Sequence, residues 1–320
     1  MKNLATIVSA AALATIAVIP ANAQKETVAV FTKNQTNPFF ETVRVGTANA
    51  AKALGVTVIQ YIPIKPDSIP EQLSQVEDAI IKKPSAVLFT PVDYKALVPA
   101  IDKMVNSKIP VVGMTDRPAG GAILSFVGVD DHRLGVETAT DLFKAMGGKG
   151  TVIALEGVKG TLTSTDRMRG FNDALKQFPN IKLLASQPAN YQRLQALQVM
   201  ANLMQTHPQV DGVFAANDAM ATGVVEALAA ANRKALVVGI NGSKEAVDLI
   251  KTGKMHATGS SDPFMQGCLG MLTTVRVLRG MPIAKELMVP VVVINSSNVK
   301  DHDIPIESRS CPKIDEVATK

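Results

Sequence analysis

The sequence predicts a doubly wound α/β fold that is divided into two lobes. Short apolar runs rich in β-branched residues alternate with longer stretches of helical periodicity. Strands that are apolar throughout suit a parallel sheet with helices on both faces, and the alternation is typical of consecutive βαβ units. The chain has 320 residues. This is longer than a single hydrophobic core usually supports, which favours two lobes.

The elements follow one another in a regular order. Strands are expected at 28–31, 56–61, 86–90, 111–114, 125–129, 151–155, 181–185, 212–216 and 235–240. Helices are expected at about 40–54, 70–82, 94–106, 133–146, 166–177, 191–206, 218–231 and 243–252. Asp93 precedes the helix expected from Tyr94, and Asn217 or Asp218 can cap the helix that follows them. The pattern pauses at the Pro-Ala-Gly-Gly segment 118–121, which places a lobe boundary near 118–131.

Residues 1–23 have the three parts of a secretory signal peptide. Lys2 gives a positive start, residues 4–19 are apolar apart from small hydroxyl residues, and Pro20 precedes a small-x-small site that ends at Ala23. A membrane anchor is the alternative, but the run is short for a span and no basic flank follows it. We therefore expect export, with cleavage after Ala23 and a mature chain that starts at Gln24.

Composition excludes several classes of function. The formal charge is +5, and the basic residues are scattered, with no run longer than Lys82-Lys83. A scattered excess is typical of a solvated surface, so nucleic acid is not an expected partner. The four histidines form no metal-binding or Ser/His/Asp pattern, and no glycine-rich phosphate loop is present. We expect neither an enzyme nor a bound metal or cofactor.

Cys268 and Cys311 are the two cysteines of the chain. In an exported protein two cysteines can form a single disulfide, and the alternative is two buried free thiols. The bridge is favoured because the bacterial envelope is oxidising and Cys311 lies in a C-terminal tail, where thiols are rarely buried.

The candidate site consists of polar residues that follow the strands, because open α/β sheets bind ligands beyond the carboxyl ends of their strands. These positions are 33–37, Thr90, Asp116-Arg117, 160–167, Tyr191, Asn217-Asp218, Asn241 and 260–262, with Phe39 and Phe40 nearby. Planar polar groups can make paired hydrogen bonds with hydroxyls, and aromatic faces can stack on the C–H face of a ring. This combination predicts a sugar ligand.

The same residues carry a resemblance to a family. The motifs are 36–40 (TNPFF), 115–117 (TDR), 156–157 (EG) with Gly160, 166–167 (DR), 187–191 (QPANY), 213–221 (VFAANDAMA), 238–242 (VGING) and 257–258 (AT). In this order and spacing, the mature chain resembles the periplasmic sugar-binding proteins of ABC importers, in the ribose, galactose and arabinose class. The resemblance implies the type I periplasmic binding protein fold and a location in the periplasm.

The resemblance also implies roles for individual residues. Asn37, Phe39 and Phe40 would contribute from the first lobe, and Asp116 and Arg117 would accept from and donate to sugar hydroxyls. Arg167, Tyr191, Asn217 and Asn241 would complete the site from the second lobe. Lys33, Thr90 and Ser261 stand at ligand positions where ribose binders carry other residues, and Asn241 stands where they carry Asp.

Simpler roles compete with these assignments. Asp116 and Arg117 can form a surface ion pair, and one of the two phenylalanines can belong to the core. Arg169 competes with Arg167 for the cleft, Asn217 can act only as a helix cap, and Lys33 can be a solvated loop residue.

Lys33 and Asn241 would make the site more positive than a ribose-type site, which would favour a sugar acid. If Lys33 pairs with Asp116, however, the added charge is neutralised within the protein. We expect this pairing, and a neutral pentose or deoxyhexose is therefore favoured over a sugar acid. A polyol binder and a receptor for a small furanone-type signal are further alternatives. A transcription regulator of related fold is excluded, because a signal peptide stands where the DNA-binding helices would be.

The resemblance predicts lobes that each contain two segments of the chain. The N-terminal lobe would comprise 24–130 and 262–290, and the C-terminal lobe 131–261 and 291–320. Three hinge crossings near 118–131, 259–263 and 288–292 would join them. The partners would be one small carbohydrate and an ABC permease in the inner membrane, and the protein would act as a monomer.

Overall fold

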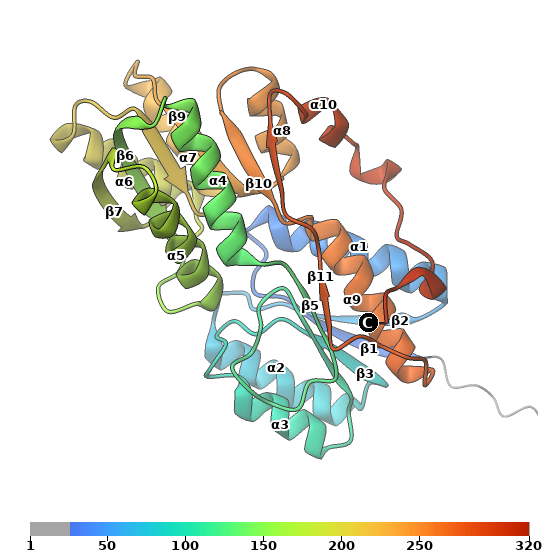
Figure 1. Cartoon of the computed structure of the whole chain (residues 1–320). Helices are drawn as coiled ribbons and strands as arrows, with labels where there is room; N and C mark the ends of the chain where they lie inside the picture. Colours follow the sequence, from blue (N-terminus) through green and yellow to red (C-terminus); the bar gives the residue numbers. More distant parts are fainter. Residues whose placement is uncertain (1–25, 320) are drawn as a thin grey trace, which may run out of the picture.

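Two six-stranded sheets form the frame of the protein, one in each lobe (Figure 1). The computed structural model describes residues 26–319, so the signal peptide predicted for residues 1–23 lies outside the described residues. Within 26–319 no helix combines the length and the apolarity that a membrane span requires. The predicted doubly wound two-lobe fold is confirmed.

The first lobe contains a parallel sheet with the strand order β11-β5-β4-β3-β1-β2. Its elements are β1 (Thr27–Phe31), α1 (Pro38–Leu54), β2 (Thr57–Tyr61), α2 (Ile69–Lys82), β3 (Ala86–Phe89), α3 (Val98–Asn106), β4 (Val111–Met114), β5 (Phe126–Gly128), α9 (Pro263–Leu278) and β11 (Glu286–Met288). Successive residues of a strand point to opposite faces. Val28 and Val30 therefore pack in the core under α1 and α9, and Ala29 and Phe31 pack in the core under α2 and α3.

The second lobe has the strand order β12-β10-β9-β8-β6-β7, in which only the β10–β12 pair is antiparallel. Its elements are α4 (Asp131–Ala145), β6 (Lys149–Glu156), α5 (Leu162–Lys176), β7 (Asn180–Pro188), α6 (Arg193–Thr206), β8 (Gly212–Ala215), α7 (Asp218–Ala230), β9 (Leu236–Asn241), α8 (Lys244–Lys251), β10 (Ala257–Ser260), β12 (Val292–Asn295) and α10 (Val299–His302). Each strand except β12 continues the βαβ alternation.

Helices α4 and α5 touch along their backbones, and this contact positions part of the site. A Cβ atom on Gly135 would lie 2.3 Å from the backbone oxygen of Arg167, and one on Gly170 would lie 2.2 Å from that of His132. Only glycine permits so close an approach. As a result, the N-terminal turn of α4 and the second turn of α5 lie side by side at the edge of the second lobe that faces the first.

The chain passes between the two sheets at residues 129–130, 261–262 and 289–291. These segments fall within the three predicted hinge crossings. The C-terminal tail differs from the prediction, which assigned 291–320 entirely to the second lobe. Residues 309–317 return to the first lobe, where Cys311 forms a disulfide with Cys268 and Val317 is buried in the core. The second lobe ends with α10, and the apolar residues of the tail then pack against the core of the first lobe beside α9.

Two predicted helix starts are wrong. The helix expected from Tyr94 begins at Val98, because the Asp93 side chain accepts hydrogen bonds from the Lys95 and Ala96 amides and holds a turn before the helix. The helix expected from residue 166 begins at Leu162, because Thr161 caps it through the Ser164 amide. The second correction places Arg167 well inside α5 rather than at its first residues.

Candidate functional site

The loop between β1 and α1 supplies the first wall of the site. Asn37 caps α1, with its side-chain oxygen accepting from the Phe39 amide at 3.1 Å, and Asn34 in turn accepts from the Asn37 amide at 2.9 Å. These bonds fix the start of the helix, where the Phe39 and Phe40 rings meet edge to face with centroids 5.1 Å apart. Phe40 is buried and Phe39 is half-buried, so both form a rigid apolar wall.

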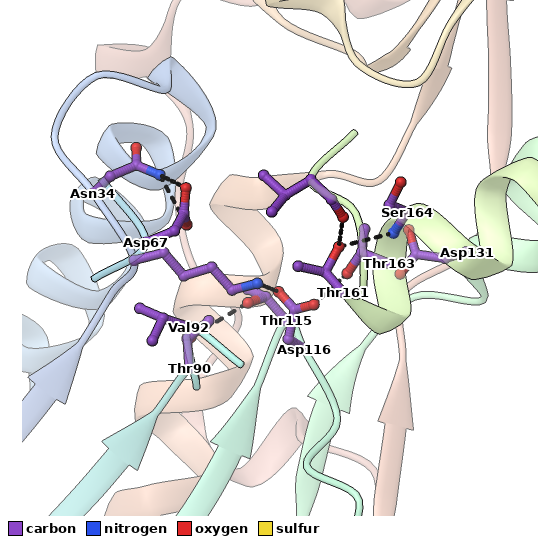
Figure 2. Close-up of polar contacts among 12 residues, drawn as sticks. Asn34, Asp67, Thr90, Val92, Thr115, Asp116, Asp131, Thr161, Thr163 and Ser164 are labelled. Carbon is purple, nitrogen blue, oxygen red and sulfur yellow. Dashed lines mark hydrogen bonds and ion pairs between the residues drawn. The ribbon is translucent and has the colours of Figure 1, made fainter. Parts of the chain in front are cut away.

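Polar and charged side chains line the same cavity as this wall, among them Asn34, Asp67 and Asp116 (Figure 2). The Lys33 ammonium is 2.7 Å from an Asp116 carboxylate oxygen, and both side chains are 8% exposed. Asn34 donates a long hydrogen bond of 3.4 Å to Asp67, and burial raises the pKa of Asp67 while Lys33 opposes that rise. Lys33 is therefore buried and paired with a carboxylate rather than solvated.

Asp116 also connects the two lobes. The Thr163 hydroxyl, from the first turn of α5, donates a hydrogen bond to the Asp116 carboxylate, which follows β4 of the first lobe (Figure 2). Thr163 is placed there by the Thr161 cap of the same helix. The structure thus shows the two lobes in contact across the cleft, joined by a direct hydrogen bond between their side chains.

Arg167 anchors the second wall. Its Nε donates to Asp131 at 2.7 Å, and its Nη1 donates to the Ala216 carbonyl at 2.8 Å and to the Asn241 side chain at 3.4 Å. Burial raises the pKa of Asp131 to about 6, although Arg167 opposes the rise. Arg167 is only 5% exposed, and its guanidinium is oriented by partners on three separate elements. Arg169 is instead a largely exposed residue that pairs with Asp166, as expected for the solvated residue of the two.

Tyr191 and Asn217 complete this wall from neighbouring loops. Tyr191 has a positive φ of 59°, and its ring lies over Gly157, where a Cβ atom would be 2.1 Å from the ring carbon Cζ. Asn217 caps α7 by accepting from the Met220 amide at 2.9 Å, and its amide group donates to the Tyr191 carbonyl at 3.4 Å. The cap role considered for Asn217 is therefore real, and it coexists with a place in the cavity wall.

A cavity between the lobes is lined by side chains from both of them. Most of the predicted ligand residues line it: Lys33, Asn37, Phe39, Phe40, Asp116, Arg167, Tyr191, Asn217 and Asn241. Asn34, Thr161 and Thr163 also line it, and they fall within the predicted segments 33–37 and 160–167 without an individually predicted role. Lining residues outside the predicted positions are Asp67, Thr115, Val129, Asp131, Val158 and Gln266. Asp67 had a usable signal, since it follows β2 and precedes the Ser68 cap of α2. Asp131 had none, because it belongs to a helix start whose partner, Arg167, is distant in the sequence.

Three predicted residues lie outside this lining. Arg117 turns away from the cavity, because its guanidinium is 2.7 Å from Glu286 and 4.2 Å from the centre of the Phe126 ring. Thr90 is fully buried behind Thr115, whose hydroxyl donates to it at 3.3 Å. Ser261 is also fully buried, and its carbonyl accepts from the side chain of Gln266, the neighbour that does reach the cavity.

Each cation of the cavity wall is paired with a carboxylate, and the wall holds one further carboxylate. Its cations are Lys33 and Arg167, and its carboxylates are Asp67, Asp116 and Asp131. Lys33 pairs with Asp116 and Arg167 pairs with Asp131. The pairing of Lys33 with Asp116, considered from the sequence, is present. The positive charge that Lys33 adds is consequently neutralised inside the protein, and none of it remains to balance a charged ligand.

Two α/β lobes that enclose a polar cavity with aromatic walls define a two-lobed binding protein. The chain belongs to the periplasmic binding protein domain family, whose model matches residues 28–282. It is 34% identical to the ribose import binding protein of Escherichia coli over 88% of this chain and 94% of that protein. It is 32% identical to the D-allose-binding periplasmic protein of the same organism, over 76% of this chain and 81% of that protein.

A solved structure shows the same architecture. An ABC transporter periplasmic solute-binding protein of Actinobacillus succinogenes, with bound D-allose, superimposes with a TM-score of 0.83 and 33% identity. The match covers 87% of this chain and all of that one. The fold is thus that of type I periplasmic binding proteins, as the resemblance implied.

Proposed function

We propose that the protein captures one neutral monosaccharide between its lobes and delivers it to an ABC import permease. The observation that carries the ligand class is the pairing of both cavity cations with carboxylates of the protein itself. A neutral sugar can use these preoriented groups as hydrogen-bond donors and acceptors, whereas a sugar acid would add a negative charge to a buried site in which both cations are already paired.

The chemical groups of the cavity wall support the same proposal. Phe39, Phe40 and Tyr191 offer aromatic faces, and Asn37, Asn217 and Asn241 offer amide groups around them. Relatives are named for ribose, a pentose, and for D-allose, a hexose, which supports a monosaccharide as the ligand. Within that class a pentose or deoxyhexose remains our preferred ligand. Binding without catalysis is consistent with relatives that are named as binding proteins.

A thermal-shift screen tests the ligand class. The panel contains pentoses, hexoses, deoxyhexoses, polyols, aldonates and furanone signals, each added to the purified mature protein. A compound that binds only the folded state raises the melting temperature, and the rise grows with the logarithm of its free concentration relative to its Kd. We expect a selective rise with one or a few neutral sugars. A rise with aldonates or furanones and none with neutral sugars would contradict the proposal.

The location follows from the family and from the leader sequence together. We infer that the protein works in the periplasm as a monomer, after removal of residues 1–23. N-terminal sequencing of protein recovered by osmotic shock should begin at Gln24. Recovery only in the membrane fraction, with Met1 retained, would contradict export by cleavage.

A further inference from the structure

The C-terminal segment links the two lobes a fourth time, apart from the three hinge crossings. It starts in the second lobe, where Val299 of α10 is buried in the core and Asp303 forms ion pairs with Lys244 and Lys251 of α8. The chain then leaves that lobe and runs down to the first, beside α9 (Figure 1). We call residues 304–317 the tail segment.

The tail segment is fixed firmly to the first lobe. Arg309 Nη2 lies 2.7 Å from both carboxylate oxygens of Asp262, and its guanidinium is 4.6 Å from the centre of the Phe264 ring. Cys311 is joined to Cys268 of α9, with Cα atoms 5.4 Å apart. Further along, the Ile314 carbonyl accepts from Arg276 at 2.7 Å. The disulfide predicted from the sequence is present, and it fastens the tail segment to α9 of the first lobe.

Asp262 occupies a sensitive position in the hinge. It lies in the crossing between β10 and α9, caps α9 by accepting from the Met265 amide at 3.1 Å, and has a positive φ of 37°. A positive φ is uncommon for residues other than glycine, although aspartate adopts it more readily than most. Arg309 pairs with the carboxylate of this residue from outside the hinge.

We propose that the tail segment is a tether that narrows the range of angles between the lobes. The disulfide closes a covalent ring of residues 268–311, and this ring passes through both lobes by way of the hinge crossing at 289–291 and the tail segment. Residues 303–309 span the gap between anchors on opposite lobes, and a fully extended chain of six residues reaches only about 20 Å. Part of that reach is taken up by the 3₁₀ turn at Ile306–Ser308. Wide rotations about the hinge must therefore break the Asp262–Arg309 contact or unwind the turn.

A distance measurement between the lobes of the ligand-free protein tests the tether. Ketone-bearing amino acids placed at Ile81 on α2 and at Leu194 on α6 take spin labels without involving cysteine. These positions are 77% and 65% exposed. Electron paramagnetic resonance then gives the distribution of the interlobe distance. A label pair at Ile64 and Ile81, both on the first lobe, serves as the control.

Three perturbations release the tether at different points. They are reduction of the disulfide by a phosphine, the double variant Cys268→Ser/Cys311→Ser, and Arg309→Gln, which leaves the disulfide intact. Each should broaden the interlobe distribution while the control pair keeps its width. An interlobe width that does not change on reduction or in the double serine variant overturns the proposal. Equal broadening of the control pair also overturns it, since that result is local unfolding. No ligand is used, so the result is independent of what the cavity binds.

Discussion

Replacement of Arg167 by methionine is expected to weaken sugar binding by about 2–4 kcal/mol, the usual cost of removing a buried charged anchor from a binding site. The guanidinium holds Asp131, the Ala216 carbonyl and Asn241 in one network. Its loss removes donors for the ligand and leaves Asp131 buried without a cation, which raises the pKa of that carboxyl further. Isothermal titration calorimetry with the sugar found in the screen measures the loss.

The matched control for this variant is Arg169→Met. Arg169 lies two residues along the same helix, its side chain is 59% exposed, and it contacts Asp166 at the surface. It should change affinity very little, because exposed ion pairs contribute little free energy. Melting curves of both variants are needed, since Arg167 is buried and its ion pair also supports the fold. An Arg167→Met affinity within twofold of wild type would remove Arg167 from the binding site.

Replacement of Lys33 by methionine separates a neutral ligand from a sugar acid. The change removes the charge and keeps most of the aliphatic stem. With a neutral sugar the variant should lose about 1–3 kcal/mol of binding free energy, roughly one hydrogen bond, and wild-type affinity should depend weakly on salt. With a sugar acid the loss should be larger, and wild-type affinity should fall as salt rises. Calorimetry at two ionic strengths distinguishes the two outcomes.

Two further variants test whether the effect of Lys33→Met comes from its ion pair with Asp116 or from the change in net charge. Lys33→Met strands the Asp116 carboxylate, which then retains only the Thr163 hydroxyl as a partner from the described residues. Adding Asp116→Asn removes that buried charge, so the double variant should recover stability that the single variant loses. Lys65→Met changes the net charge equally at an exposed position in the same lobe and should leave binding unchanged. A similar loss in Lys65→Met would mean that overall charge, and not the site, governs affinity.

The sequence predicted most strands well because each is an apolar run that ends in a turn residue. Helix α9 was missed for the opposite reason. It is buried on nearly every side between α1 and the sheet, so it has no polar face to reveal a helical period. Helix α1 was expected from about residue 40 and starts at Pro38, where Asn37 caps it and proline occupies the first helical position.

The site was predictable where ligand residues follow strands. It was unpredictable where the role of a residue depends on the direction in which its side chain points. Arg117 and Arg167 both occupy family positions, yet the side chain of Arg117 turns to Glu286, which lies 169 residues further along the chain. No local pattern indicates such a partner. The same holds for Thr163, which reaches Asp116 only because two lobes that are separate in the sequence meet at the cleft.

The covalent ring formed by the disulfide also changes what a single break in the backbone does. One peptide bond cut between Leu269 and Ser310 opens the ring but leaves both fragments attached through Cys268 and Cys311. The exposed stretch around Ile304 is the natural place for a protease to cut. A molecule nicked there migrates as one chain under non-reducing conditions and as two after reduction, and it can retain its fold and its place in transport after damage that would otherwise release its last residues.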